Sequence, residues 1–440
     1  MEKIIVQGGR TLHGTLRVQG SKNAALPILA ACVLVNGVCR IANCPDLSDV
    51  NAAVRILRHL GCAVKREGDC LTVDARSVFR AAIPNGLMRE MRSSIVFLGS
   101  VLARVGRASL CAPGGCEIGL RPIDLHLSSL RALGAQIRED NGALTCSVRG
   151  GFSGTTIRLS FPSVGATENV LLAAATAKGT TLLYGAAREP EIDDLIRFLN
   201  ACGARIRSVG AGTLQIEGVA ALHGCCHRVI PDRIAAMTYL AAVGAAGGDA
   251  LLTDVEPTHM QSVIRVLERA GCRITAEESA VRICAPARLR AVQGLCTAPY
   301  PGFPTDAQAA VMAMLCTADG VSTLTETIFE NRFHHVRALR RMGANITVKD
   351  CTAAVNGVPR LFGAAVSAVD LRAGAALVVA GLGAEGETTI DAVHHIDRGY
   401  EKIEACLQTL GARIERSADS GSTESKQQYP VRLVPVQSGG

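Results

Sequence analysis

One glycine-rich loop places a cysteine close to a cation. The run Pro113-Gly114-Gly115-Cys116 follows a predicted strand, and Arg121 stands shortly after it, before the next predicted helix. Gly- and Pro-rich loops lie on the surface, and a nearby positive charge favours the thiolate over the thiol. We therefore predict that Cys116 is exposed and titrates near neutrality, as a catalytic group must.

A second set of chemically capable residues lies at the starts of predicted helices. Helix N-termini carry unpaired N–H groups and the positive end of the helix dipole, so they bind anions. The set comprises Ser21-Lys22-Asn23, Arg92-Ser93, Arg121-Pro122, Ser163-Val164, Arg188-Glu189, Pro231-Asp232-Arg233, Thr305-Asp306, Asn331-Arg332, Asp370-Leu371-Arg372 and Asp397-Arg398. Singly, such residues are caps and surface ion pairs. As a recurring set, they predict a site for a phosphate or carboxylate ligand.

The elements that position these residues form an internal repeat. An apolar residue, a glycine and a small residue recur at Gly61, Gly134, Gly203, Gly271, Gly343 and Gly411, always between a helical and a strand pattern. Successive glycines are 68 to 73 residues apart. This regularity predicts six copies of one supersecondary unit. Each glycine is suited to a left-handed helix cap, so we assign none of them a catalytic role.

The first copy shows the predicted unit. Residues 24–34 and 48–59 read as helices, the second with a 3.6-residue apolar period, and residues 38–41 read as a strand between them. Residues 63–65 and 71–73 then form a hairpin. The unit is therefore of the βαβαββ type, and the fold class is α/β (α+β).

Three copies per domain is the division that keeps each core within the usual size. We predict a first domain over 21–230, which carries the Cys116 loop, and a second domain formed by 1–20 with 231–417. The anion-binding residues are then expected to line a cleft between the domains. Residues 418–440, rich in Ser, Gly and Gln, are expected to be a partly disordered tail, with 431–434 a candidate last strand.

The amino-acid composition indicates which binding partners and which cellular compartment to expect. Apolar residues make up 48% of the chain, the formal charge is +7 and the basic residues are scattered, which disfavours a nucleic-acid partner. The longest uncharged runs are too short to span a membrane. The 17 cysteines are irregularly spaced and often lie in apolar runs, which indicates reduced thiols in the cytoplasm. Only Cys225-Cys226-His227 clusters locally, without CxxC pairs, so no metal is predicted.

Several motifs, in order, resemble the UDP-N-acetylglucosamine 1-carboxyvinyltransferase family, a branch of the EPSP synthase-like enolpyruvyl transferases. The resemblance covers residues 1 to about 415. The matching stretches are 20–25, 113–122, 163–167, 187–191, 231–234, 303–306, 330–333, 370–372 and 395–401. It implies two three-unit domains around buried helices, an inside-out α/β barrel. It also implies the substrates phosphoenolpyruvate and UDP-N-acetylglucosamine, with no cofactor and no obligate protein partner.

The resemblance also implies roles for individual residues. Lys22, Arg121 and Arg398 match positions on the phosphate side of phosphoenolpyruvate, Arg332 and Arg372 match positions on its carboxylate side, and Asn23 and Asp370 belong to the same substrate site. Asp306 matches the general base that faces the sugar 3-hydroxyl, and Cys116 the proton donor to the methylene carbon. Positions that bind the UDP-sugar are matched by Arg92, Arg121, Pro122, Ile123, Asp124, Leu125, Ser163, Val164, Asp306 and Ile328.

The chain departs from the family pattern at four positions. Phe161 stands where some members have a lysine near the nucleotide, Ala235 replaces a common glutamate, and Glu117 and Leu120 are unusual in the cysteine loop. None of the four removes a catalytic group. We expect them to alter affinity or loop motion.

Two alternatives stay open beside the main interpretation. A related transferase uses shikimate 3-phosphate as its acceptor, but it lacks the Pro-Gly-Gly-Cys loop found here. A catalytically silent paralogue that binds the UDP-sugar and regulates another enzyme would not require Lys22, Cys116, Asp306 and Arg398 together.

Overall fold

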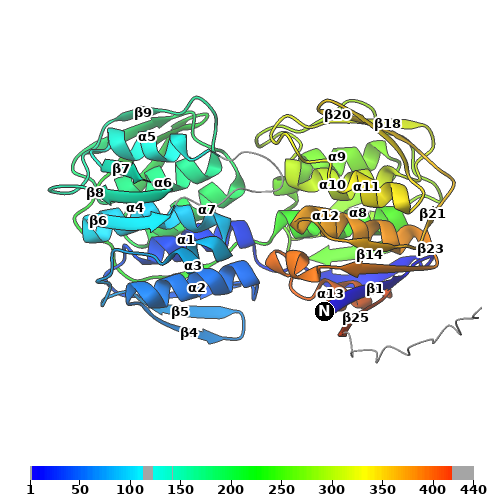
Figure 1. Cartoon of the computed structure of the whole chain (residues 1–440), viewed down its shortest axis with the longest axis horizontal. Coiled ribbons are helices and arrows are strands. Elements are labelled where there is room, and N and C mark those ends of the chain that lie inside the picture. Colours follow the sequence, from blue (N-terminus) through cyan, green and yellow to red (C-terminus); the bar gives the residue numbers. More distant parts are fainter. Residues whose placement is uncertain (1, 112–121, 141, 419–440) are drawn as a thin grey trace, which may run out of the picture.

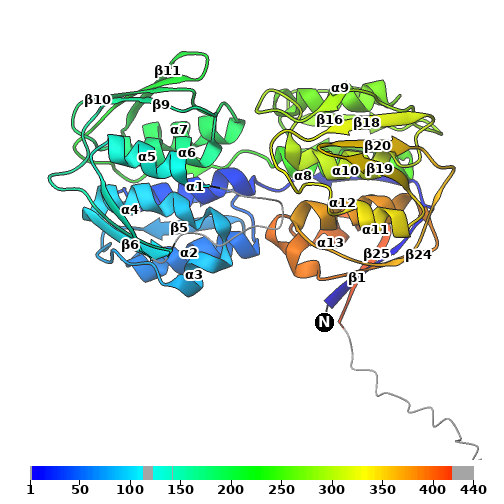
Figure 2. The ribbon, with the colours of Figure 1, turned by 45° about the horizontal axis from the view of Figure 1, so that its top comes forward.

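The computed structural model describes residues 2–111, 122–140 and 142–418. Two lobes lie side by side, each with helices inside and sheets toward the outside (Figures 1 and 2). The left lobe in Figure 1 holds the elements from α1 to β13, and the right lobe holds the elements from α8 onward together with β1. Among the described residues, no helix is both long and apolar enough to cross a membrane.

Each lobe contains three principal sheets, as expected for six repeated units. In the first lobe the strand orders are β13-β3-β5-β4, β6-β8-β7 and β11-β12-β10-β9. These strands are β3 (Val38–Ala42), β4 (Ala63–Glu67), β5 (Cys70–Asp74), β6 (Arg107–Cys111), β7 (Gln136–Asp140), β8 (Ala143–Ser147), β9 (Thr156–Arg158), β10 (Thr180–Tyr184), β11 (Arg205–Gly210), β12 (Thr213–Glu217) and β13 (Cys226–Arg228).

The second lobe repeats the pattern. Its principal sheets are β15-β16-β14-β2, β17-β18-β20-β19 and β22-β24-β1-β25, and β21-β23 is a small addition. The strands are β1 (Glu2–Gln7), β2 (Leu12–Arg17), β14 (Gly248–Thr253), β15 (Arg273–Ala276), β16 (Ala280–Cys284), β17 (Leu295–Cys296), β18 (Val321–Thr325), β19 (Asn345–Lys349), β20 (Thr352–Asn356), β21 (Leu361–Phe362), β22 (Ala365–Ser367), β23 (Ala384–Glu385), β24 (Glu387–Asp391) and β25 (Arg413–Ala418). The predicted α/β class with two similar three-unit lobes is confirmed.

Each unit contributes one inner and one outer helix. The inner helices are α1 (Lys22–Cys32), α4 (Phe97–Val105), α6 (Val164–Ala174), α8 (Arg233–Ala246), α10 (Thr305–Leu315) and α12 (Leu371–Gly383). The outer helices are α2 (Ser48–Leu60), α5 (Asp124–Ala132), α7 (Pro190–Ala201), α9 (Gln261–Arg269), α11 (Val336–Arg341) and α13 (Ile403–Thr409), and the second unit has an additional short helix, α3 (Asn85–Glu90), before α4. Short 3-10 helices precede several of these: η1 (Arg92–Val96), η2 (Pro257–Met260) and η3 (Val393–Arg398).

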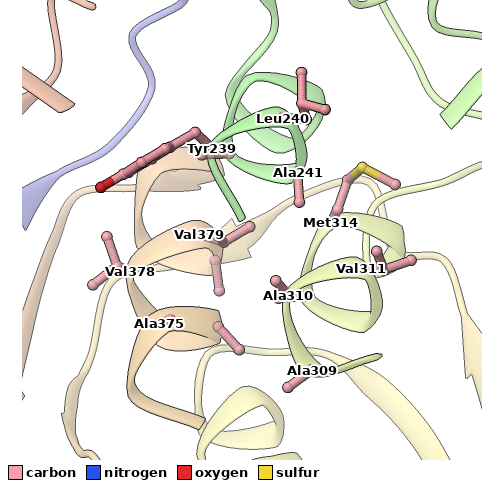
Figure 3. Packing of buried hydrophobic residues seen from close by; sticks show 14 of the residues in the cluster. Tyr239, Leu240, Ala241, Ala309, Ala310, Val311, Met314, Ala375, Val378 and Val379 are labelled. Carbon is pink, nitrogen blue, oxygen red and sulfur yellow. The ribbon is translucent and has the colours of Figure 1, made fainter. Parts of the chain in front are cut away.

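The inner helices are buried because they are apolar on all sides. In α12 every residue from Arg372 to Leu382 is buried, as expected of a helix without a polar face. Figure 3 shows Ala241 of α8, Ala310 of α10 and Val379 of α12 lying between the three helices. The approach is close: a Cβ added to Gly244 of α8 would lie 2.5 Å from Met314 Sδ of α10. Small side chains thus set the spacing of this core.

Two predictions about the unit are confirmed at residue level. In the first copy, the observed helices and strands all lie within two residues of the predicted bounds. All six repeat glycines adopt positive φ values, from 84° at Gly411 to 111° at Gly61. These left-handed caps turn each outer helix into its following strand.

The two lobes exchange strands where the chain passes between them. Strand β2 precedes α1 in sequence but pairs in parallel with β14 of the second lobe, and β13 precedes α8 but pairs in parallel with β3 of the first. The two crossings pair with each other, because Ser21 N donates to Ile230 O at 2.7 Å and Asp232 N donates to Gln19 O at 2.9 Å.

Buried apolar residues form two clusters that follow this division. One draws on residues 24–229, and the other on residues 4–18 and 234–414. On this basis we propose domains over 21–230 and over 1–20 with 231–417. Most of the tail at 418–440, including the candidate strand at 431–434, lies outside the described residues.

Candidate active site

The second lobe places a carboxylate between two arginines. Asp306 lies in the first turn of α10, Arg372 lies at the start of α12, and Arg332 lies in the turn before α11. Arg332 Nη2 donates to Asp306 Oδ1 at 2.6 Å, and Arg372 Nη2 donates to Asp306 Oδ2 at 3.1 Å. Burial by itself raises the pKa of Asp306, but Arg372 and Arg332 outweigh it and hold that pKa well below its ordinary range.

Arg372 is held in position by groups on three elements. Asp370 caps α12, its Oδ1 accepting from the backbone N–H groups of Arg372 and Ala373. Arg372 Nη1 donates to Tyr400 Oη at 3.2 Å, and Tyr400 Oη lies 2.8 Å from Thr238 Oγ1. Arg372 is only 7% exposed. Burial opposes its charge, but Asp306 and its other neighbours raise the pKa of Arg372 above the ordinary value, so it stays a cation.

A second carboxylate joins cations from both lobes. Asp49, in the first turn of α2, is 2% exposed. Lys22 Nζ donates to Asp49 Oδ2 at 3.3 Å, and Arg398 Nε donates to Asp49 Oδ1 at 3.0 Å. Burial lowers the pKa of Lys22, Asp49 raises it, and Arg372 and Arg398 lower it further. Lys22 and Asp306 also act on each other electrostatically, so the two groups form one charged cluster.

The crossing between the lobes is tied to this cluster. Lys22 N donates to Asp232 Oδ2 at 3.1 Å, while Asp232 Oδ1 caps α8 through the N–H groups of Ile234 and Ala235. The next residue, Arg233, forms a two-point ion pair with Glu191 at 2.9 and 3.2 Å. The position of Lys22 therefore depends on a carboxylate that belongs to the second lobe's first helix.

The structure brings six of the predicted residues together: Lys22, Asp306, Arg332, Asp370, Arg372 and Arg398. Asn23 follows Lys22 on α1, Ser163 caps α6 through Ala166 N, and Val164 begins that helix. Asp124 and Leu125 begin α5 after Pro122 and Ile123, and Ile328 N donates to Glu326. Within the described ranges, no hydrogen bond or ion pair joins these eight directly to the cluster.

Two helix starts differ from the prediction. Arg332 and Arg398 were expected at the first residues of outer helices, but α11 begins at Val336 and α13 at Ile403. Arg332 lies in a turn and Arg398 at the end of η3, so their charges come from the segments before the helices. Arg92 is the first residue of η1. Cys116, Glu117, Leu120 and Arg121 lie outside the described residues.

Sequence reasoning missed three residues of the cluster. Asp49 occupies an outer-helix start, the position that carries cations in other copies, so the alignment of copies could have identified it. Asp232 and Tyr400 lie within recognised motifs but were given no role. Of the departures, Phe161 is exposed on 45% of its surface, and Ala235 is buried in α8.

The arrangement favours a ligand with two anionic groups. The four cations Lys22, Arg332, Arg372 and Arg398 converge on two carboxylates, those of Asp49 and Asp306. The other two acids of the cluster, Asp232 and Asp370, face helix N-termini as caps. Guanidinium groups bind carboxylates and phosphates through two-point hydrogen bonds. The cations lie in two groups, around Asp49 and around Asp306, which suits a small molecule with an anionic group at each end.

Fold and site together define the class of protein. Residues 6–407 match the family model described as EPSP synthase (3-phosphoshikimate 1-carboxyvinyltransferase), and the chain belongs to this family. Among solved structures, the enolpyruvyl transferase NikO from Streptomyces tendae is 27% identical with a TM-score of 0.85, over 94% of this chain and 99% of that one. EPSP synthase from Acinetobacter baumannii, at 18% identity and a TM-score of 0.75 over 95% and 100%, shares the fold.

Several named relatives are more similar in sequence to this chain than these solved structures are. UDP-N-acetylglucosamine 1-carboxyvinyltransferase 2 of Caldanaerobacter subterraneus subsp. tengcongensis is 48% identical over 94% of this chain and all of its own length. UDP-N-acetylglucosamine 1-carboxyvinyltransferase of Cellvibrio japonicus is also 48% identical, over 94% of this chain and 99% of the relative. That of Myxococcus xanthus is 46% identical over the same shares.

Proposed function

We propose that the chain transfers the enolpyruvyl group of phosphoenolpyruvate to the 3-hydroxyl of UDP-N-acetylglucosamine and releases phosphate. This transfer is the first committed step of peptidoglycan precursor synthesis. The observation that carries the proposal is identity of 46–48%, over 94% of the chain, to relatives named for the UDP-N-acetylglucosamine reaction. The charged cluster supplies the chemistry, and no cofactor is required.

The cations divide between the two ends of phosphoenolpyruvate. Arg332 and Arg372, both nearly buried, bind the carboxylate, and Asn23 and Asp370 complete this side. Lys22 and Arg398, held together by Asp49, bind the phosphate with Arg121. Because the phosphate leaves with negative charge, the same cations stabilise the transition state of its departure.

Asp306 changes partner during this reaction. In the structure its carboxylate accepts from the guanidinium groups of Arg332 and Arg372, so its low pKa makes it a weak base. When the carboxylate of phosphoenolpyruvate takes over these two cations, Asp306 loses the groups that lower its pKa. It then becomes a stronger base and accepts the proton of the sugar 3-hydroxyl. Binding of the donor thereby activates the base for the acceptor.

The two half-reactions balance without an external proton donor. The 3-hydroxyl oxygen bonds to C2 of phosphoenolpyruvate while Cys116 gives a proton to C3, which yields a tetrahedral phospho-ketal. C3 then returns a proton to the Cys116 thiolate, the C2–O bond to phosphate breaks, the phosphate leaves with the proton that Asp306 had accepted, and the double bond re-forms in the product. Cys116 fits the donor role because its Gly-rich loop also holds Arg121.

The UDP-sugar is bound mainly by the first lobe in this proposal. Arg92, Arg121, Pro122, Ile123, Asp124, Leu125, Ser163 and Val164 supply that side, and Asp306 and Ile328 supply the other. The exposed Phe161 lies two residues before the α6 cap and offers an apolar surface where a cation is otherwise expected. We expect weaker nucleotide binding as a result.

A single assay distinguishes the proposed function from two alternatives, a shikimate 3-phosphate transferase and a silent UDP-sugar-binding paralogue. Shikimate 3-phosphate is the acceptor named by the family description, but the Pro113–Cys116 loop favours the UDP-sugar. A silent UDP-sugar-binding paralogue would have no need for the ion-paired arrangement of Lys22, Asp306 and Arg398. We also propose a cytoplasmic location, where its 17 cysteines stay reduced, and a role in cell shape and division through wall synthesis.

The test is phosphate release from phosphoenolpyruvate by the purified chain. It is measured with UDP-N-acetylglucosamine, with shikimate 3-phosphate or with no acceptor, and repeated for Asp306→Ala. We expect release only with UDP-N-acetylglucosamine, and none from the variant. Release with shikimate 3-phosphate would overturn the acceptor, and UDP-sugar binding without release would indicate the silent paralogue.

A further inference from the structure

Three cysteine thiols from distant parts of the chain converge in the first lobe. They belong to Cys39 of β3, Cys202 at the end of α7, and Cys225 just before β13, and their sulfur atoms all lie within 4.8 Å of one another. Cys202 Sγ and Cys225 Sγ are 3.3 Å apart. Within the described ranges, this is the single group of three or more His, Cys, Asp or Glu side chains close enough to share a metal ion.

A fourth thiol adjoins the three. Cys32, the last residue of α1, is fully buried and lies beside Cys39. Its sulfur does not belong to the group whose sulfur atoms all lie within 4.8 Å of one another. Cys32 is therefore the nearest candidate for a further ligand.

We propose that Cys39, Cys202 and Cys225, with Cys32 as the fourth ligand, form a structural binding site for Zn²⁺. Tetrahedral zinc with Zn–S bonds of about 2.3 Å requires sulfurs about 3.8 Å apart. Among Cys39, Cys202 and Cys225 the observed separations, 3.3 Å for one pair and at most 4.8 Å for the others, bracket this value. Cys32 lies farther from at least one of the three, so its thiol must move closer to become a ligand.

Charge favours a divalent ion over a monovalent one. Each thiol that becomes a ligand gives its proton to the solvent, so the site becomes negative. Cys32, Cys39 and Cys202 are almost completely buried in an apolar core, where uncompensated charge is unfavourable. With the same thiolates, Zn²⁺ leaves one negative charge fewer than Cu⁺. Cys225 is only partly buried and gives the ion a route from the surface.

Other buried cysteines of the chain show what ordinary packing looks like. Cys316 in the second lobe donates to the carbonyl of Met312, one helical turn earlier. Cys44 and Cys146 lie in the first-lobe core and do not belong to the thiol group. His227, two residues after Cys225, is bound to Asp194 at 3.1 Å and is not a ligand. The convergence is thus specific to Cys39, Cys202 and Cys225, with Cys32 beside them.

A bound ion would connect the first and third units of the first lobe. Cys32 and Cys39 belong to the first unit, and Cys202 and Cys225 to the third. The proposed site stands apart from the charged cluster and does not depend on the proposed enzyme activity. Metal content and spectra therefore test it even in a protein without turnover.

The experiment uses the full chain, reduced, stripped with a chelator and titrated with Co²⁺ or Zn²⁺ without oxygen. We expect one ion per chain and, with Co²⁺, the thiolate charge-transfer and d–d absorption of a tetrahedral sulfur site. The double variant Cys39→Ser with Cys202→Ser loses both signals, whereas the matched variant Cys44→Ser with Cys146→Ser keeps them. Absent absorption, or equal binding in both variants, would overturn the proposal.

A second measurement uses only the wild-type chain, so it tests the proposal even if the double cysteine variant fails to fold. Zn²⁺ added to the stripped wild-type chain raises its Tm, and excess chelator reverses the increase. No change in Tm would contradict a structural site. Mass spectrometry of the untreated chain checks the remaining alternative: loss of two hydrogens in a peptide pair linking Cys202 and Cys225 would indicate a disulfide in place of the metal.

Discussion

Asp49 and Arg398 are bound to each other at 3.0 Å although 349 positions separate them in the chain. They belong to opposite lobes, and Lys22 shares the same carboxylate. A single buried acid thus holds a cation from each lobe in the place where we propose that phosphate binds. In the proposed function, the lobes therefore meet through the same groups that bind the substrate.

Asp49→Asn tests this arrangement. Asp49 is the leading group that raises the pKa of Lys22, whereas burial, Arg372 and Arg398 lower it. Without the negative charge, the pKa of Lys22 falls further, and the cation is lost at a lower pH. We expect the alkaline limb of kcat/KM against pH to move to lower pH, with about a tenfold loss above the limb for each unit moved. Asp319→Asn, at an exposed ion pair, is the control and leaves the limb in place.

Asp306→Asn separates binding from turnover. The substitution removes the carboxylate that occupies Arg332 and Arg372, which then bind the carboxylate of phosphoenolpyruvate without competition. We expect binding by calorimetry to become about tenfold tighter, a gain of about 1.4 kcal/mol, while phosphate release is lost. Weaker binding would refute the exchange of partners. Asp249→Asn is the control: it removes a surface carboxylate that accepts two hydrogen bonds from a single guanidinium group, that of Arg282.

Tyr400→Phe loosens Arg372 without removing it. The variant loses the hydroxyl that accepts from Arg372 Nη1 and contacts Thr238 Oγ1. We expect KM for phosphoenolpyruvate to rise several-fold with a smaller change in kcat, and stability to fall by about 1 kcal/mol. Tyr239→Phe is the control, because it removes a hydroxyl from the neighbouring ring, which packs edge-on against Tyr400, and leaves the Tyr400 hydroxyl in place. If both variants raise KM equally, positioning by the Tyr400 hydroxyl is excluded.

Glu168 of α6 gives a pH dependence of stability. Burial, with Glu191 and Glu189 adding to it, raises the pKa of Glu168 to about 8. The folded chain therefore holds this proton over a range where the unfolded chain has released it, so the group lowers stability progressively as pH rises from its ordinary pKa toward 8. Glu168→Gln removes this dependence. We expect the Tm of the variant to exceed that of the wild type by an amount that grows between pH 5 and pH 8, and a constant difference would contradict the raised pKa.

Cys116 is tested chemically. An epoxide analogue of phosphoenolpyruvate is expected to alkylate its thiolate and abolish phosphate release, with one adduct per chain by mass spectrometry. Cys226→Ala removes an exposed cysteine elsewhere and leaves inactivation unchanged. The same treatment is applied to Cys116→Ser, and both its residual activity and its mass are measured. If the analogue still inactivates this variant or still forms an adduct with it, another residue is the one alkylated.

The repeat made the fold predictable. A positive-φ glycine and a 3.6-residue apolar period are local signals, so the helices and strands of the first unit could be placed within about two residues. The exchange of β2 and β13 between lobes has no such local signal, because a parallel pair is chosen by the whole sheet. The helix starts predicted at Arg332 and Arg398 were wrong for a related reason. The sequence pattern there is equally compatible with a longer helix, but the structure has turns before α11 and η3 before α13.

The site was predictable in part. Cations at helix starts are visible in the sequence, as are the motifs around them. The partner of each cation is not visible, because Asp49 meets Arg398, and Asp306 meets Arg372, only after the units have packed. The thiol group was not predicted for the same reason. Cys39, Cys202 and Cys225 share no spacing motif, and they come together only when the first lobe folds.

The strand exchange also orders events during synthesis. The first lobe has all of its strands once β13, at Cys226–Arg228, leaves the ribosome, and it can close at that point. Strands β1 and β2 are made first but must wait for β14, β24 and β25, the last of which is Arg413–Ala418. Strand β2 gains its partner when β14, at Gly248–Thr253, has been made. Strand β1 stays without β24 and β25 until the last described strand has been made, with open edges that other chains can pair with.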